Sequence, residues 1–306
     1  MERDGFQMYK RHMIPKGLGH PLWIPQANMR LPVPYRQAGV CIGDVGIITR
    51  EGAFDCLFNI CLPLDHPINS SLLPDDFAPL HPPLDHQHII EVREFSSNAY
   101  LASNDIYRRS SLIISGINFT TSAPEGAILT MPRGAYVQRL ANEKQFDDYI
   151  ANNAETWYKI ANERLRRDAK NGDLRIVLGC HKSTAWGMAT FVNRTQYSSS
   201  RAQSLRFITT KVGPEADDNV GLFDGQFQDL RNQCLFVRAP VMTLNDQAWL
   251  RISQQSEVRI EENGQSSSSI RQPDASPRRT SGSLPNPIPS RSLENRGRQS
   301  AVSKLA

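Results

Sequence analysis

The chain has 306 residues, of which 39% are hydrophobic and 22% charged, and its formal net charge is +4 at pH 7. Most of this charge lies in residues 254–306, which hold eight Lys and Arg against five Asp and Glu and leave the rest of the chain at +1. A nearly neutral folded part lacks the concentrated basic face of proteins that bind nucleic acid or acidic membranes, although local basic patches stay open.

Targeting and cysteine patterns indicate an intracellular protein. No apolar run approaches the ~18 residues of a transmembrane helix, and residues 1–17 lack the apolar core of a signal peptide. The five cysteines are an odd number without CxxC spacing, which predicts reduced thiols rather than a disulfide framework. We therefore expect no transmembrane segment and a cytoplasmic or nuclear location.

The N-terminal part is predicted to be a flexible segment followed by an extended strap. We expect residues 1–16 to be flexible. Residues 14–36 hold five prolines, which forbid a helix and favour an extended chain laid over the domain. Trp23 would anchor this strap.

Residues 39–60 are predicted to form a β-hairpin. A two-residue turn at Glu51-Gly52 would pair Arg50 with Ala53 and place Asp44 opposite Asn59 as a polar pair. Because Glu disfavours positive φ, a longer bulged loop stays open. The register gathers these apolar residues on one face: Val45, Ile47, Phe54, Cys56, Phe58 and Ile60.

A long connection and further strands come next. Residues 62–86 hold six prolines and read as an irregular loop. Runs rich in aliphatic and aromatic residues predict strands at 88–95, 111–119, 126–131, 204–209 and 233–238.

A helix is predicted over residues 143–170, where apolar residues recur at three- and four-residue spacing. Asn142 would cap its first turn with Gln145 at the reciprocal capping-box position, and Asn171-Gly172 would end it.

A second hairpin is predicted from strands at 173–179 and 185–192, with Cys180 and His181 in its turn. A nucleophile and its base usually come from separate segments, so this adjacency is weak evidence for catalysis. We assign no catalytic residue.

Asp85, His86 and His88 lie together at the end of the proline-rich connection and are ligand types that zinc accepts. No HExxH or Cys/His signature accompanies them, and such residues are ordinary in solvated loops. We expect no metal and no cofactor, and keep these three residues as the metal candidates.

Residues 251–306 are predicted to form a disordered tail rich in Ser, Arg and Pro. From Gln254 onward, twelve serines, five prolines and no aromatic residue cannot bury enough apolar surface to offset chain entropy. Ser276 matches a proline-directed kinase site and Ser281 a basophilic one.

Several recognisable phrases are spread over residues 19–244. They are GVCIGDVG (39–46), LFNI (57–60), EGAIL (125–129), NAETWY (153–158) and NQCLFVR (232–238). These phrases resemble those of an uncharacterised family of proteins from mushroom-forming (basidiomycete) fungi. The resemblance implies no activity. It leads us to expect an acidic residue after Gly179-Cys180, where this chain has His181.

The expected fold is one α+β domain over residues 17–250, in which antiparallel β-hairpins form a sheet and one long amphipathic helix packs on it. Gasdermin-type pore-forming domains have a similar architecture, which by itself does not imply function.

We interpret the chain as a non-catalytic intracellular binding or regulatory domain for an unknown protein or small-molecule partner. An enzyme of unrecognised type is the alternative, and a gasdermin-like membrane-active domain is the third hypothesis. A concave pocket on which ionisable groups from three or more segments converge would favour an enzyme, and a filled core without one would favour binding.

Overall fold

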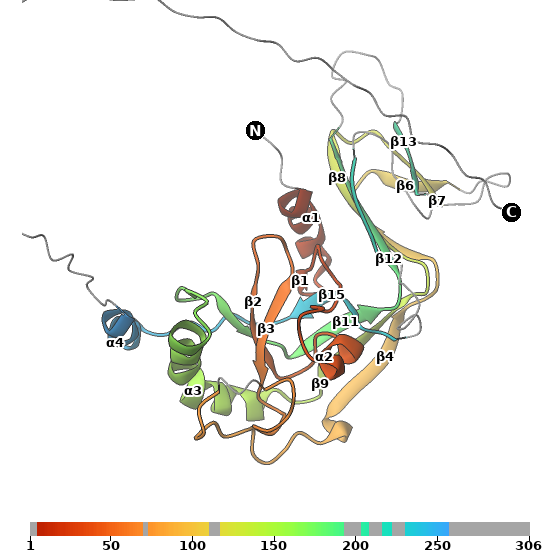
Figure 1. Ribbon diagram of the computed structural model, residues 1–306. Helices are drawn as coiled ribbons and strands as arrows, with labels where there is room; N and C mark the ends of the chain where they lie inside the picture. Colours follow the sequence, from red (N-terminus) through yellow and green to blue (C-terminus); the bar gives the residue numbers. More distant parts are fainter. Residues whose placement is uncertain are drawn as a thin grey trace, which may run out of the picture. The chain divides into compact units, whose positions relative to one another are not determined.

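A computed structural model describes residues 5–69, 73–109, 117–192, 203–207, 216–221 and 230–256, within a unit that ends at Val258. Antiparallel sheets and a long helix confirm the expected α+β class (Figure 1). The helices are α1 (Gly5–Met13), α2 (Val33–Ala38), α3 (Lys144–Lys159) and α4 (Asp246–Ser256), with 3-10 turns η1 (Ile14–Lys16) and η2 (His86–His88) and a π-helical turn η3 (Ile160–Arg164). The strands are β1 (His20–Pro21), β2 (Asp44–Ile48), β3 (Phe54–Asn59), β4 (Ile89–Phe95), β5 (Ala99–Ala102), β6 (Ile106–Arg109), β7 (Ile117–Thr121), β8 (Glu125–Met131), β9 (Ala135–Leu140), β10 (Leu174–Ile176), β11 (Gly179–Ser183), β12 (Trp186–Val192), β13 (Gln203–Phe207), β14 (Ala216–Gly221) and β15 (Gln233–Arg238).

A continuous ribbon of long strands runs through three of the sheets. The three sheets have the strand orders β1-β15-β11-β9-β4, β14-β12-β8-β5 and β13-β7-β6. Along the chain, β4 leads into β5 and β6, while β7, β8 and β9 return beside them. β11 pairs with β9, β12 with β8 and β13 with β7, so each segment of the chain contributes one strand to each of the three sheets.

The first hairpin, β2–β3, lies between α3 and α2 and joins β10 in a separate sheet (Figure 1). The two-residue turn is wrong and the longer loop is found, because Thr49 rather than Arg50 pairs with Ala53. A bulge at Leu57 then restores the register, so that Asp44 lies opposite Asn59. The bulge divides the apolar residues between two cores: Val45, Phe58 and Ile60 pack in the core with α3, and Phe54 and Cys56 pack in the core with Tyr35 of α2.

The long helix begins close to its predicted start and ends earlier than predicted. Asn142 Oδ1 accepts from Lys144 N at 3.0 Å, as a cap does, but Gln145 donates to Pro82 and closes no capping box. The helix stops after Arg164 instead of Lys170. The side chain of Asn162 bonds both the N–H and the C=O of Ala169, which holds a non-helical loop there.

The second predicted hairpin is wrong. β10 pairs with β2, and β11 pairs with β9 and β15. Cys180 and His181 therefore lie inside a strand and not in a turn. β12 pairs with β8 and β14, whose residues lie far away in sequence.

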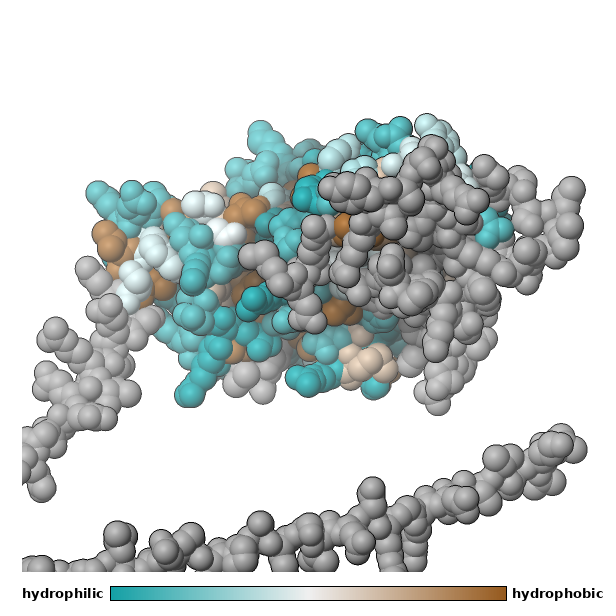
Figure 2. All heavy atoms as spheres, turned by 90° about the horizontal axis from the view of Figure 1, so that it is seen from above, coloured by the Kyte–Doolittle hydropathy of each residue, from teal (hydrophilic) through white to brown (hydrophobic). Residues whose placement is uncertain are grey.

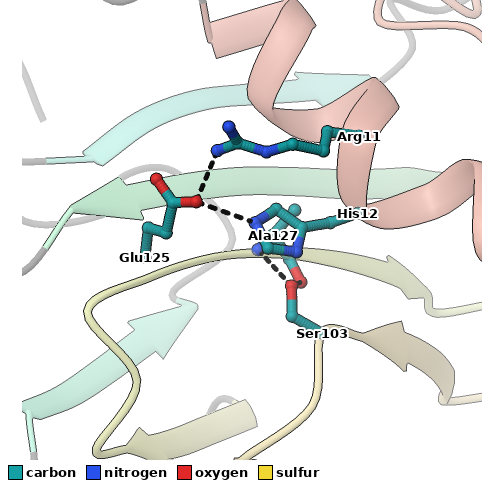
Figure 3. A network of polar contacts seen from close by, with 5 residues as sticks. All are labelled: Arg11, His12, Ser103, Glu125 and Ala127. Atoms are coloured by element: carbon teal, nitrogen blue, oxygen red, sulfur yellow. Dashed lines mark hydrogen bonds and ion pairs between the residues drawn. The ribbon is translucent and has the colours of Figure 1, made fainter.

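Residues 5–13, which we expected to be flexible, form α1. Tyr9 and Met13 are fully buried and pack on β8 and β12 beside Leu129 and Trp186. Figure 3 shows the polar contacts at this junction, where Arg11 Nη2 lies 2.5 Å from Glu125 Oε1 and Ser103 Oγ accepts from Ala127 N at 2.7 Å. The apolar stripe of the helix explains its docking, since burying such side chains drives folding.

The expectation that prolines forbid a helix in residues 14–36 is wrong, because α2 begins at Val33 with Pro34 in its first turn, where proline is tolerated. The remaining predictions are strands and the tail. The strand at 233–238 is confirmed with the same bounds as β15, and strands are also found as β4, β7, β8 and β13. Residues 111–116 of one predicted strand lie outside the described residues. So does the tail from residue 257 onward, with Ser276 and Ser281, whereas residues 246–256 form α4.

Candidate functional site

A pocket of about 350 Å³ lies on one face of the sheet that contains β11, β9 and β4. We name it the Lys182 pocket. Its lining residues are Gln37, Ala38, Cys41, Glu91, Tyr136, Gln138, Lys182, Leu230 and Arg231.

Strand register brings the polar side chains of the pocket to one face. Lys182 of β11 lies opposite Tyr136 of β9, and Gln138 of β9 lies opposite Glu91 of β4. Directly opposed residues of antiparallel strands point to the same face of a sheet. Three neighbouring strands therefore supply an ammonium group, a phenol, an amide and a carboxylate to one surface.

Helix α2 and the turn after it form the opposite wall. The side chain of Asn232 donates to Arg36 O at 2.7 Å and fixes the end of α2 against β15. Gly39 has φ +67°, and a Cβ atom there would lie 2.2 Å from Asn232 O, so only glycine fits. This close approach brings Ala38 and Cys41 over Lys182.

Lys182 is a buried cation with few partners. Lys182 is only 4% exposed. Its Nζ donates to Ala38 O at 2.8 Å and lies 3.7 Å from Cys41 Sγ. Burial lowers the pKa of Lys182, but interactions with Cys180 first and also with Asp44 raise it more, so the side chain keeps its positive charge at neutral pH. Burial raises the pKa of Cys41 to about 11 even though Lys182 opposes the rise, so Cys41 is a neutral thiol.

The other charges in the pocket form a closed pair. Arg231 Nη1 lies 2.5 Å from Glu91 Oε1, and its guanidinium stacks 4.2 Å from the centre of the Tyr136 ring. Glu91 Oε2 accepts from Gln138 Nε2 at 2.8 Å. The hydrogen bond from Gln138 and the charge of Arg231 lower the pKa of Glu91.

The predicted pair Asp44 and Asn59 lies behind this wall. Asn59 Nδ2 donates to Asp44 Oδ1 at 2.7 Å, and Asp44 Oδ2 accepts from Cys41 N at 2.7 Å. Asp44 thus holds the turn that carries Cys41, without lining the pocket. Burial raises the pKa of Asp44 to about 7, against the hydrogen bonds that lower it.

The other sequence candidates are not brought together. Asp85 Oδ1 caps η2 by accepting from Gln87 N at 2.9 Å, and the described residues contain no group of three His, Cys, Asp or Glu that could hold a metal. Cys180 is buried below the pocket, while His181 points to the other face of β11 and contacts Glu94 at 2.8 Å.

Sequence reasoning did not select Lys182, Glu91, Tyr136 or Arg231. The alternation of charged and apolar residues at 89–95 could have marked Glu91 as lying on one face of a strand. No local signal distinguishes Lys182 from a surface lysine, because its burial depends on α2, which is distant in sequence.

Comparisons of the chain with models of protein families, with curated proteins and with solved structures found no match.

Proposed function

We propose that this domain binds a small anion in the Lys182 pocket and performs no chemistry on it. The observation that carries the proposal is the buried ammonium of Lys182, whose two close partners are a carbonyl and a neutral thiol. Within the described part of the chain, no carboxylate oxygen lies within 4.0 Å of Nζ. A bound anion would give the ammonium a counterion at contact distance, where an ion pair in a protein interior is strong.

The protonation states of the pocket support binding rather than catalysis. A general acid or base works best when its pKa lies near the operating pH. The pKa of Cys41 is about 11, that of Lys182 is raised and that of Glu91 is lowered. Each group therefore stays in one form at neutral pH, which suits a fixed recognition surface.

The exposed surface supports a small ligand over a broad apolar protein partner. On the face drawn in Figure 2, brown hydrophobic residues are scattered among teal ones. The large hydrophobic residues that are exposed in the described ranges are Ile14, Met29, Val33, Val92, Tyr107, Val241 and Leu250. Protein interfaces usually present such residues as a contiguous patch.

Thermal unfolding at constant ionic strength tests the proposal. Acetate, butyrate, benzoate, succinate and hydrogen phosphate are added singly to the wild type, to Lys182→Met and to Lys144→Met, a matched control on the exposed surface of α3. At least one anion should stabilise the wild type and the control, by about 2.7 kcal/mol at ~100 times its Kd. If every anion shifts Lys182→Met as much as the wild type, the proposal is wrong.

An enzyme is the second candidate, because ionisable groups from β4, β9, β11 and the turn after α2 converge on one concave pocket. Alkylation by iodoacetamide at pH 7.5, with peptide mapping of Cys41, separates the two. A thiol with a pKa near 11 should react roughly a hundredfold more slowly than a model thiol. Alkylation of Cys41 faster than the model thiol would favour an enzyme with a thiolate nucleophile.

Membrane activity is the third hypothesis. In the described ranges no helix is long and apolar enough to cross a membrane. β8 and β12 are apolar on both faces, with Leu129 and Met188 against α1 and Ile128 and Phe191 on the other side. Strands that are apolar on both faces are typical of a sheet buried in a protein core. Leakage of anionic liposomes, with and without residues 257–306, is the direct assay.

Location and regulation complete the proposal. Free Cys41, Cys56, Cys61, Cys180 and Cys234 support a reducing compartment such as the cytoplasm or nucleus. The kinase-site matches at residues 276 and 281 would make the tail regulatory. Intact-mass measurement of protein from its native host tests this, and an unmodified tail in several growth states would contradict it.

A further inference from the structure

The charges around the Lys182 pocket define the ligand more closely, on the premise that the proposed anion binding is correct. We infer that the ligand is a small monocarboxylate, and that the Glu91–Arg231 ion pair makes the pocket select monoanions over dianions.

The size of the pocket limits the ligand first. A volume of about 350 Å³ lies near the lower end of the range of small-molecule pockets, ~300–1,000 Å³. The pocket therefore suits a ligand of metabolite size.

The charge balance of the wall limits it further. Arg231 is already neutralised, because its guanidinium contacts Glu91 at 2.5 Å and covers the Tyr136 ring. Cys41 is a neutral thiol. The charge left without a contacting counterion is the single positive charge of Lys182, which matches one carboxylate.

A dianion would meet an unfavourable environment. Tight phosphate sites combine several donors with more than one available cation, often a bidentate arginine. Here the one arginine of the wall is engaged by Glu91, so it offers a dianion no second free positive charge. Glu91 is held in place by Gln138, so it does not turn away from the pocket without losing a hydrogen bond.

The test compares two kinds of anion on four proteins. Benzoate and butyrate serve as monoanion probes and succinate and hydrogen phosphate as dianion probes, with Kd measured by calorimetry at pH 7.5 and constant ionic strength. The proteins are the wild type, Glu91→Gln, Arg231→Gln and Glu94→Gln. Glu94→Gln is the matched control, because it removes the same charge from β4 beside His181 on the other face.

In the wild type and in Glu94→Gln, a monoanion should bind at least about tenfold more tightly than either dianion, since the second charge of a dianion would enter the pocket without a free cation to meet it. Glu91→Gln should strengthen dianion binding about tenfold and change monoanion binding less. Arg231→Gln leaves Glu91 unpaired and should weaken monoanion binding about tenfold.

The outcomes separate this inference from the proposed function. Absence of any anion binding that is lost in Lys182→Met, the variant of the thermal-unfolding test, would refute the proposed function. Lys182-dependent binding with a preference for dianions, or with the same preference in Glu91→Gln and Arg231→Gln as in the wild type, would leave the proposed function standing and overturn the selectivity. Circular dichroism of each variant verifies folding, and Glu91 and Arg231 are partly exposed positions where Gln is expected to be tolerated.

Discussion

Replacing Asp44 by Asn should remove a pH-dependent part of the stability of this protein. Asp44 is fully buried, and burial raises the pKa of its carboxyl to about 7. The folded protein therefore holds this proton more tightly than the unfolded chain does. The associated stability is complete below about pH 4 and is lost as the pH rises through about 7.

The size of this pH-dependent stability follows from the difference between the pKa of Asp44 in the folded protein and in the unfolded chain. The pKa rises from 3.8 to about 7, and each pH unit corresponds to ~1.4 kcal/mol, which gives roughly 4 kcal/mol. Asn adds a separate cost that does not depend on pH. Both Asp44 oxygens accept hydrogen bonds from N–H groups. In Asp44→Asn the side-chain NH2 group would face either Cys41 N–H or Asn59 Nδ2–H, and the lost hydrogen bond should cost ~1–3 kcal/mol of stability. Only the slope with pH therefore reports the ionisation.

Urea unfolding from pH 4 to pH 8 measures this slope. The free energy of unfolding of the wild type minus that of Asp44→Asn should fall by roughly 4 kcal/mol between pH 4 and 7 and then stay level. Asp147→Asn, an exposed position in the first turn of α3, is the control and should show no such fall. A difference that stays constant with pH, or rises, would refute the assignment of a raised pKa to Asp44.

Three further predictions concern stability and are checked by urea unfolding. Gly39→Ala should destabilise the protein by more than ~2 kcal/mol because its Cβ would overlap Asn232 O. The control Gly17→Ala, with φ +75° and no atom within 4 Å of its Cβ, should cost only the ~1 kcal/mol of left-handed backbone strain. Equal losses of stability in the two variants would contradict the clash. Arg11→Ala should cost no more than ~1 kcal/mol, since the ion pair to Glu125 is solvent-exposed, and a larger loss would mean that it clamps α1. Tyr9→Phe should stabilise the protein by ~1 kcal/mol because its buried hydroxyl has no hydrogen-bond partner in the described structure, and a loss would reveal one.

Local patterns predicted those elements whose own residues determine them. Residues 233–238 hold a short continuous apolar run between polar ends, and β15 has the predicted bounds. The apolar stripe from Phe146 to Trp157 predicted α3, because one helix face buries those side chains. α1 was missed, since so short a helix is stabilised mainly by its contacts with β8 and β12 rather than by its sequence.

Pairing between distant segments was not predictable in this way. Residues 173–192 have the strand content of a hairpin, but β11 finds its partners in β9 and β15, and periodicity carries no information on which strands pair. The candidate site also depends on contacts between segments that are distant in sequence. Lys182 meets Ala38, Glu91 meets Arg231, and neither contact joins neighbours in sequence. The predicted pairing of Asp44 with Asn59 is found because the bulge at Leu57 offsets the longer turn.

The bulge at Leu57 has a consequence for how the protein unfolds. It turns the β2–β3 hairpin into a wall shared by two cores, with Phe58 packed toward α3 and Phe54 toward α2. Neither core keeps its packing if the other releases the hairpin. The two cores should therefore open together, and the amide hydrogens of β2 and β3 should exchange with solvent only through the global unfolding of the domain.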